Sequence, residues 1–327
     1  MAERFLVTGA LGCIGAWTVK RLVEEGVPVW AYDLPAEPRR LRLIMGDDAL
    51  AKVRLVAGDI TDLGAFERTV ADHGITHVVH LAAFQVPFVK ADPLQGLKVN
   101  MLGSAIVLET LRKYKDQIKG YVYASSTAVY GPPSLYPAGS LAHDAPLFPM
   151  NLYGVHKQAG EGMARIYWQD YGVGSIGLRP CVVYGPGRDQ GMTSTPTKAM
   201  LAAAAGRSYR ISFSDTLVYQ YADDAARAFL QAARTPSQGA PVYSLGGTSA
   251  SMADVVRAIE AAAPEAKGTI SIDPVEIGVT PGIDSSALDK AIGKAHWIGL
   301  GEGVRQTVAT LRAGIQTGKL DVDRMLA

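Results

Sequence analysis

Two residues four positions apart, Tyr153 and Lys157, carry the most distinctive chemistry in this sequence. On a helix, this spacing places both side chains on one face. A phenol with an ordinary pKa of about 10 is a poor base at neutral pH. A neighbouring ammonium group lowers that pKa, so the pair can take a proton from an alcohol or return it to a carbonyl. Because an isolated pair of this kind is more often a surface contact, the hypothesis depends on the surrounding sequence.

Hydroxyl side chains follow the short apolar run at residues 120–124. The sequence continues with Ser125, Ser126 and Thr127 before it reaches Tyr130. If the run is a parallel strand, hydroxyls at its carboxyl end point into the cleft and can hydrogen-bond a reacting oxygen. Taken alone, such a cluster is more often a helix cap or a turn.

Near its start, the chain carries glycines at the spacing of a phosphate-binding loop. Gly9, Gly12 and Gly15 follow the apolar run Phe5–Thr8 and lead into a helical pattern. The glycines permit a tight turn, a close approach of the backbone to pyrophosphate, and close packing of helix on strand. The free N–H groups at the start of the helix favour phosphate. This context indicates a dinucleotide-binding loop.

Asp33 ends the second apolar run after this loop. A carboxylate at that position accepts hydrogen bonds from both ribose hydroxyls of NAD, and its charge repels the 2′-phosphate of NADP. Arg39 and Arg40 could in principle serve a 2′-phosphate, but they follow several residues later. NAD is therefore the predicted cofactor.

Apolar, β-branched runs alternate with stretches of helical spacing through the first half of the chain. The expected strands are 5–8, 27–32, 53–56, 77–81, 120–124 and 174–179. The expected helices are 16–25, 63–71, 101–114 and 153–171. This alternation predicts βαβ units and a parallel sheet covered by helices on both faces.

After Tyr184–Gly187 the character of the sequence changes, because Gly, Pro, Ser and Thr become dense up to Thr197. Further helices are expected at 197–205, 223–233 and 252–263. We expect an α/β protein with a large dinucleotide-binding domain and a smaller, mostly C-terminal α/β substrate domain. The first comprises residues 1–180, rejoined by about 218–246, and the second residues 181–217 and 247–327. A cleft between them should lie outside the carboxyl ends of the strands.

The composition argues against several classes of partner. The 327 residues carry a formal net charge of +1 and no basic stripe, which argues against nucleic acid. Two cysteines, Cys13 and Cys181, fit a reducing compartment, and no His/Cys cluster has the spacing of a metal site. No apolar run reaches the ~18 residues of a membrane span, and no signal peptide is evident. These features predict a cytoplasmic protein that acts on a small molecule.

Together, these residues resemble the extended short-chain dehydrogenase/reductases, and within them the NAD-dependent epimerase/dehydratase family. The resemblance covers nearly the whole chain and is weakest in the last third. The matching segments are Thr8–Gly15, Asp33, Asp59-Ile60, His80–Ala83, Asn100, Ser125–Gly131, Tyr153 with Lys157, and Arg179–Gly187. The resemblance implies a Rossmann fold, NAD as cofactor, and a homodimer built from the helices after Asn100 and around Tyr153.

The resemblance also implies a role for individual residues. Ser126 takes the position of the catalytic hydroxyl, with Thr127 as its alternative, and Tyr153 that of the general base beside Lys157. The implied cofactor-binding residues are Gly9, Leu11, Gly12, Cys13, Ile14, Gly15, Asp33, Asp59, Ile60, Leu81, Ala82, Ala83, Asn100, Tyr153 and Lys157. The candidate substrate-binding residues are Gln85, Thr127, Arg179 and Arg188.

Departures from the family pattern bear on the substrate. Members that act on nucleotide sugars usually carry an asparagine where this chain has Val182 and an arginine where it has Leu217. Without these polar contacts, the charges of a nucleotide diphosphate would lack partners. Dehydratases carry an Asp-Glu pair where this chain has Thr127-Ala128, and many galactose-type epimerases a lysine where it has Gln85.

Three hypotheses follow. The first is a dehydrogenase that oxidises a secondary alcohol or hemiacetal of a small sugar, sugar acid or similar polar alcohol, with exchangeable NAD. The second is a sugar or nucleotide-sugar epimerase that retains NAD and works through a keto intermediate. The third is a regulator that binds NAD without turnover, which the intact Tyr153 and Lys157 disfavour.

Overall fold

A seven-stranded parallel sheet organises the first part of the molecule. The computed structural model describes residues 2–137, 139–279 and 281–326. The strand order is β10-β6-β5-β4-β1-β2-β3, and every neighbouring pair is parallel. The strands are β1 (Phe5–Thr8), β2 (Val29–Asp33), β3 (Arg54–Ala57), β4 (His77–His80), β5 (Gly120–Ala124), β6 (Ile176–Arg179) and β10 (Val242–Ser244). This arrangement confirms the predicted Rossmann-type α/β fold.

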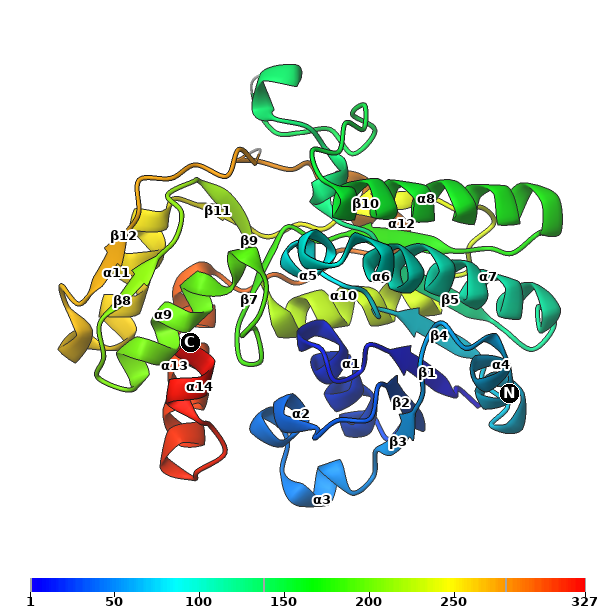
Figure 1. Cartoon of the computed structure of the whole chain (residues 1–327), viewed down its shortest axis with the longest axis horizontal. Helices are drawn as coiled ribbons and strands as arrows, with labels where there is room; N and C mark the ends of the chain where they lie inside the picture. Colours follow the sequence, from blue (N-terminus) through cyan, green and yellow to red (C-terminus); the bar gives the residue numbers. More distant parts are fainter. Residues whose placement is uncertain (1, 138, 280, 327) are drawn as a thin grey trace.

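Side chains of the central strands alternate between two apolar cores, as expected for a sheet that helices cover on both faces. In β1, Phe5 and Val7 belong to one core and Leu6 to the other. The first core is completed by α1 (Cys13–Glu24) and α10 (Ala222–Arg234), and the second by α4 (Leu63–Asp72), α7 (Gly103–Lys113) and α8 (Leu152–Tyr171). Helices α7 and α8 run side by side (Figure 1).

The chain order reverses at the centre of the sheet, because β1 leads to β2 on one side while β4 lies on its other side. The loops that leave the carboxyl ends of β1 and β4 therefore diverge. A crevice at such a switch point is where α/β sheets of this type bind ligands. The glycine loop and the segment after His80 meet at this crevice.

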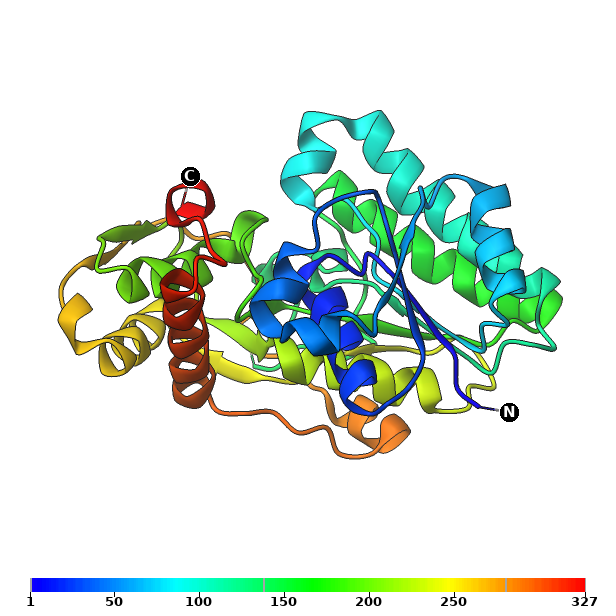
Figure 2. The same ribbon diagram turned by 90° about the horizontal axis from the view of Figure 1, so that it is seen from below.

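A second body lies at the other end of the molecule, on the left in Figure 1 and Figure 2. A three-stranded sheet has the order β11-β9-β7, and β8 pairs with β12. These strands are β7 (Val182–Tyr184), β8 (Tyr209–Ile211), β9 (Leu217–Tyr221), β11 (Thr248–Ala250) and β12 (Ile270–Ile272). They share one apolar core with α9 (Thr195–Ala204), α11 (Met252–Ala262) and α13 (Leu300–Gln316).

Several short elements were not expected from the sequence. They are α2 (Arg39–Ile44), α3 (Asp47–Leu50), α5 (Val86–Ala91), α6 (Pro93–Leu97), a π-helical turn η1 (Lys98–Leu102), α12 (Ser286–Ile292) and α14 (Val322–Leu326). Because η1 precedes α7, the helix expected at 101–114 begins at Gly103 instead. Short 3₁₀ turns are η2 (Thr127–Val129), η3 (Pro133–Leu135), η4 (Met192–Ser194) and η5 (Pro264–Ala266).

The proposed domain division can be compared with these elements. The strand β10 joins the seven-stranded sheet and α10 packs on α1, whereas β9 belongs to the three-stranded sheet. We therefore keep the two-domain division as a proposal, with the return to the first domain starting after β9.

A buried polar network ties α8, the helix that carries Tyr153, to the sheet. At the end of β6, the Arg179 guanidinium donates from Nε and Nη2 to the two carboxylate oxygens of Glu161 on α8, at 2.8 and 2.6 Å. Their side chains are 7% and 8% exposed. The Ser125 hydroxyl donates to the same carboxylate, and Arg179 Nη1 donates to the Tyr130 hydroxyl and the His143 carbonyl. The ion pair and its hydrogen bonds therefore join β6, α8, the segment after β5 and the loop that contains His143.

Replacing Arg179 by methionine should destabilise the protein strongly. The substitution leaves the Glu161 carboxylate buried without its partner, which costs about 3–5 kcal/mol of the free energy of unfolding. Urea denaturation followed by circular dichroism measures this loss. Arg305→Met is the matched control, because Arg305 pairs with Glu302 on the exposed face of α13. Equal denaturation midpoints for the two variants would contradict the role assigned to the network.

Candidate active site

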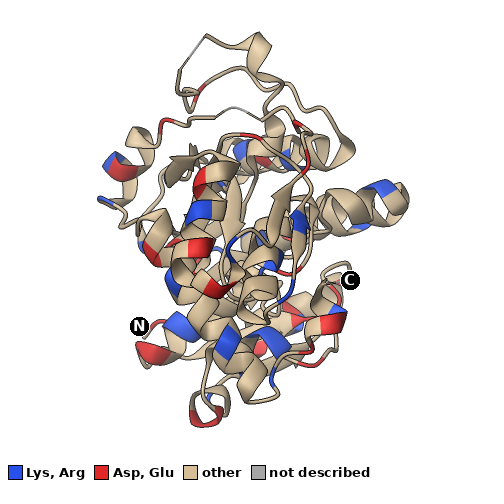
Figure 3. Ribbon diagram, turned by 90° about the vertical axis from the view of Figure 1, so that its left-hand side faces the viewer, with Lys and Arg blue, Asp and Glu red and all other residues tan. Residues whose placement is uncertain are grey.

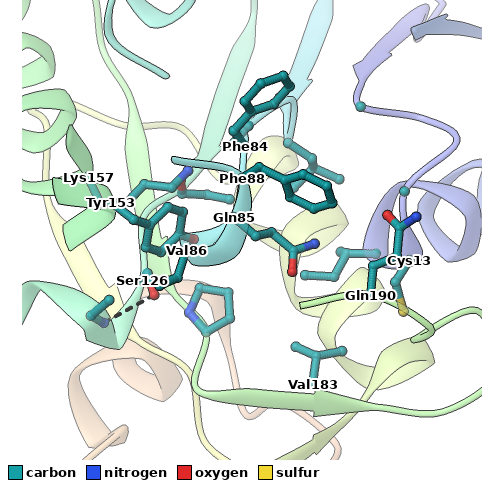
Figure 4. Close-up of a pocket in the computed structure, with 18 of the residues that line it drawn as sticks. Cys13, Phe84, Gln85, Val86, Phe88, Ser126, Tyr153, Lys157, Val183 and Gln190 are labelled. Carbon is teal, nitrogen blue, oxygen red and sulfur yellow. Dashed lines mark hydrogen bonds between the residues drawn. The ribbon is translucent and has the colours of Figure 1, made fainter. Parts of the chain in front are cut away.

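A cavity of about 680 Å³ lies at the switch point and extends towards the second body. Figure 4 shows part of its lining. The cavity brings together almost all of the predicted site residues. Those that line it are Gly9, Leu11, Gly12, Cys13, Ile14, Gly15, Asp33, Asp59, Ile60, Leu81, Ala82, Ala83, Gln85, Ser126, Thr127, Tyr153, Lys157 and Arg188.

The glycine loop has the shape of a phosphate cradle. Gly9 has a φ of +65°, and a Cβ atom there would lie 2.6 Å from the backbone nitrogen of Ala82. A Cβ atom on Gly15 would lie 2.2 Å from the carbonyl oxygen of Gly9. Helix α1 then starts after Gly12 without a side-chain cap. Its first N–H groups therefore have no helical acceptor and suit a pyrophosphate, so the loop fits the predicted dinucleotide.

Asp33 is fixed at the end of β2 beside this loop. Its carboxylate accepts hydrogen bonds from the backbone N–H groups of Leu11 and Leu34, both at 2.8 Å. Burial raises the pKa of Asp33, whereas the two backbone hydrogen bonds and the charge of Arg40 act in the opposite direction. The arrangement suits the ribose hydroxyls of NAD.

Arg40 is already engaged within the protein. Its Nη1 donates to the Leu11 carbonyl at 2.7 Å, and its Nη2 lies 2.6 Å from the Asp189 carboxylate. Together with a hydrogen bond from Trp17 Nε1 to the Pro186 carbonyl at 2.9 Å, this ion pair fastens the loop after β7 onto the glycine-loop side of the cavity. A 2′-phosphate would have to compete with Asp189 for this arginine, which agrees with the prediction of NAD.

Two predicted residues lie off the cavity. Asn100 is buried behind the wall, where its amide accepts from the Phe84 N–H at 2.7 Å and donates to the Phe84 carbonyl at 2.9 Å. It therefore holds the segment after β4 in place and does not itself line the cavity. Arg179 was expected to contact substrate, but its guanidinium is committed to Glu161, Tyr130 and the backbone, so we withdraw that expectation.

An unusually close helix contact positions Tyr153, the predicted general base. Helix α8 begins after Asn151, whose side chain accepts a hydrogen bond from the Gly154 N–H at 2.9 Å. A Cβ atom on Gly154 would lie only 2.1 Å from the Ala128 carbonyl oxygen. The start of α8 therefore rests directly on the turn η2, which begins after Ser126. This contact brings Tyr153 to the side of Ser126 (Figure 4).

Lys157 was expected to lower the pKa of Tyr153, but in the structure other groups have that effect. Burial raises its pKa, and the groups that act to lower it are the Ser126 hydroxyl, through a hydrogen bond, and the charge of Arg188. Lys157 donates to the Ala124 carbonyl at 2.6 Å and lies 5.6 Å from the centre of the Tyr153 ring. Burial lowers the pKa of Lys157 to about 8, so its ammonium can exchange a proton near neutral pH.

The cavity lining also contains residues that the sequence analysis did not single out. Phe84, Val86 and Phe88 form an apolar side of the cavity (Figure 4), and Gln190 and Met192 come from the loop after β7. The segment from Ile277 to Val279 and Ile283 complete the lining. Phe84, Val86 and Phe88 directly follow the predicted segment His80–Ala83, so their place in the sequence could have indicated them. The residues around Ile277 have no such signal, because they reach the cavity only through the packing of the second body.

The positions that depart from the nucleotide-sugar pattern have distinct surroundings. Val182 is 3% exposed and lines the cavity, as does Ala128. Leu217 is fully buried in the core of the second body and does not line the cavity. The apolar side chain of Val182 can therefore contact a ligand in the cavity directly, whereas that of Leu217 cannot.

The part of the chain that the structure describes contains neither a metal-binding cluster nor a membrane-spanning helix. Within residues 2–137, 139–279 and 281–326, no group of three His, Cys, Asp or Glu side chains could hold a metal ion. No helix in these ranges is long and apolar enough to cross a membrane. Acidic and basic residues are interspersed over the elements seen from the second body (Figure 3).

Comparison with known proteins agrees with this geometry. The pattern of the NAD dependent epimerase/dehydratase family matches residues 5–246. The UDP-glucose 4-epimerase of Mycolicibacterium smegmatis is 30% identical over 325 residues, which cover 94% of this chain and 98% of that protein. These matches extend through both bodies of the molecule.

Solved structures show the same fold. A partial-consensus L-threonine 3-dehydrogenase superposes with a TM-score of 0.81 at 28% identity, covering 95% of this chain and 100% of that one. The UDP-glucose 4-epimerase of Thermus thermophilus, solved in complex with NAD, has a TM-score of 0.78 at 27% identity, with 95% and 99% covered. Similar structures thus include both dehydrogenases and epimerases.

Gly154→Ala should impair catalysis without unfolding the protein. The added methyl group would strike the Ala128 carbonyl and move Tyr153 away from Ser126. A displacement of about 1 Å costs about 100-fold in kcat, measured as NAD reduction with any alcohol that the enzyme turns over.

The control for this substitution is Gly160→Ala on the same helix. A Cβ atom on Gly160 meets no atom within 4 Å, so activity should be retained and the helix slightly stabilised. Full activity of the Gly154→Ala variant would show that the contact does not position the tyrosine.

Proposed function

Because the chain belongs to the NAD-dependent epimerase/dehydratase family and is an NAD-dependent enzyme of the short-chain dehydrogenase/reductase superfamily, we propose that it is a dehydrogenase. Its substrate is a secondary alcohol or hemiacetal of a small sugar, sugar acid or similar polar alcohol. The observation that carries this proposal is the meeting of Ser126, Tyr153 and Lys157 with the glycine loop in one cavity.

Each of these residues has a defined task in the proposed reaction. Tyr153 is the general base that takes the proton of the substrate hydroxyl, and Ser126 hydrogen-bonds the same oxygen as a carbonyl forms. The Ser126 hydrogen bond and the charge of Arg188 oppose the effect of burial on the pKa of Tyr153. NAD, when bound, supplies the hydride acceptor. Lys157 holds the nicotinamide ribose, and its lowered pKa of about 8 lets it exchange a proton with solvent near neutral pH. The net change is loss of one hydride and one proton from the substrate.

The proposed cofactor contacts follow from the same cavity. Asp33 holds the adenosine ribose, the segments of Asp59-Ile60 and Leu81–Ala83 border the adenine and the dinucleotide, and α1 faces the pyrophosphate. Asp33 also supports the choice of NAD over NADP, because its negative charge is fixed where a 2′-phosphate would lie.

The lining of the cavity supports a small substrate. A nucleotide sugar brings a diphosphate whose charges need several polar partners. Val182 offers none, and Arg40 is paired with Asp189. The apolar side formed by Phe84, Val86 and Phe88 is equally unsuited to a diphosphate.

The second candidate is an epimerase that retains its NAD. It is favoured by relatives named as UDP-glucose 4-epimerases, one of which matches over 98% of its length. In that reaction, Tyr153 and Ser126 would act first on an alcohol and then on the keto intermediate. The two candidates differ in whether NADH leaves the protein.

Purified enzyme should reduce added NAD continuously, measured at 340 nm, with members of a panel of sugars, alditols and sugar acids. Tyr153→Phe should lower the rate about 10²–10⁴-fold, because the general base is lost, while the binding of NADH measured by fluorescence stays intact. Stoichiometric NAD bound to the purified protein, together with epimer formation and no net NADH, would favour the epimerase instead.

We further propose a homodimer built on α8 and its neighbours. Leu94 and Leu97 on α6, Leu102 in η1, and Val155 and Ile166 on α8 are between 41% and 74% exposed. Helix α8 packs beside α6, η1 and α7, so these apolar side chains belong to adjoining elements. Exposed apolar surface on neighbouring helices favours association with a second copy.

Ile166→Glu combined with Leu102→Glu should shift the protein from dimer to monomer in sedimentation-velocity experiments, because two buried charges would face the partner. Val275→Glu is the control, since Val275 is 51% exposed and belongs to the segment that follows β12. A wild-type protein that sediments as a monomer at micromolar concentration would refute the dimer.

A further inference from the structure

We propose that Arg188 binds a carboxylate of the substrate, so that the alcohol this enzyme oxidises is a small polyhydroxy acid. The inference rests on the proposed dehydrogenase activity and narrows its substrate class. Arg188 follows β7, on the loop that also carries Asp189, and its side chain lines the cavity.

Arg188 is held by neutral groups only. Its Nη1 lies 3.3 Å from the Gln85 amide oxygen, and its Nη2 lies 3.1 Å from the Thr193 hydroxyl. Its Nε is buried without a hydrogen-bond partner among the described atoms. A guanidinium offers five donors, and its fork shape matches a carboxylate, so this side chain retains capacity for an acidic ligand.

The other arginines that border the cavity or its wall are neutralised by the protein. Arg40 pairs with Asp189, and Arg179 pairs with Glu161. Within residues 2–137, 139–279 and 281–326, no carboxylate oxygen lies within 4.0 Å of the Arg188 guanidinium in an ion pair. A buried cation without a counter-charge is costly. A substrate carboxylate would supply that counter-charge.

Arg188 also acts on the reacting end of the cavity. Its charge is one of the two influences that lower the pKa of Tyr153. Arg188 also bonds the Gln85 amide, which points into the cavity from the side of Tyr153 (Figure 4), so one small molecule can contact both the guanidinium and the general base. A carboxylate on Arg188 would hold a hydroxyl-bearing carbon of the same molecule against Tyr153 and Ser126, and it would take no part in the bond changes.

The surroundings limit the size of this acid. The loop closes on Gln85, because a Cβ atom on Gly191 would lie 1.9 Å from the Gln85 amide oxygen. Gly191 has a φ of +96°, which permits this close turn. In Figure 4, the Gln85 amide points into the cavity between Tyr153 and the pair formed by Cys13 and Gln190. Gln85 and the loop around Gly191 thus close the cavity on this side, which favours an acid with a short carbon chain.

The pyrophosphate of the cofactor is the competing anion for Arg188. The charge of Arg188 also reaches Cys13 in the glycine loop. Two observations favour the substrate instead. The uncapped start of α1 is suited to phosphates, and the side-chain partners of Arg188 are Gln85 and Thr193, neither of which belongs to the glycine loop.

The experiment compares matched acids and neutral alcohols. Aldonates of three to six carbons, including D-gluconate, and the corresponding alditols, including D-glucitol, are tested as substrates for wild-type enzyme with NAD. Binding of the same compounds to the enzyme–NADH complex is measured by calorimetry. We expect kcat/KM for the best aldonate to exceed that of its alditol about 100-fold, as for other charge-assisted pairs.

Arg188→Gln should remove this preference, mainly through KM, while the Kd for NADH changes less than about 2-fold. Arg188→Lys should recover part of it, because the charge remains but the fork does not. Lys198→Gln is the matched control: Lys198 is a nearby cation that does not line the main cavity, and its loss should leave the preference intact.

Three outcomes would overturn the inference. They are oxidation of alditols as efficient as that of aldonates, absence of any aldonate binding, and a Kd for NADH that rises in Arg188→Gln in parallel with KM. The last would assign Arg188 to the pyrophosphate. Failure of the proposed function looks different: aldonates would bind in an Arg188-dependent way, yet no compound would yield net NADH.

Discussion

The direct contact between the start of α8 and the turn after β5 is the constraint on which the site depends. Because Gly154 has no side chain, the helix rests on the Ala128 carbonyl, and Tyr153 and Ser126 become neighbours although 27 residues separate them. The Arg179–Glu161 pair secures the same helix to β6 one turn beyond Lys157. The chemistry thus stands on rigid elements, while the substrate side is formed by loops.

The electrostatic design divides the cavity into two ends. At the adenosine end, two backbone N–H groups stabilise the carboxylate of Asp33, and an ion pair with Asp189 neutralises the charge of Arg40. At the reacting end, Tyr153 lies under the influence of Arg188, and Lys157 is directed to a backbone carbonyl. Negative charge is therefore fixed where ribose is expected, and uncompensated positive charge remains where an acid would react.

Much of the fold and of the cofactor side could be predicted from sequence, because their determinants are local. The glycines of 9–15, Asp33 and the pair Tyr153 and Lys157 act through turns, strand ends and helical spacing that a short window reveals. The family resemblance assigned Arg179 and Asn100 to ligands, but their hydrogen-bond partners in the structure come from distant segments of the chain. Helix α13 was not predicted although Leu300, Val304, Val308 and Leu311 have helical spacing, whereas the wall around Ile277 has no local pattern and is formed by tertiary packing.

The loop after β7 has a consequence for the lifetime of the bound dinucleotide. It is fastened to the cofactor side by Trp17 on α1 and by Arg40 on α2, and to the substrate side through Gln85. Any widening of the cleft along this loop must break those bonds together. The rate at which these bonds open then sets the residence time of the dinucleotide. A few substitutions in the loop after β7 would therefore distinguish an enzyme that exchanges its coenzyme in every cycle from one that retains it.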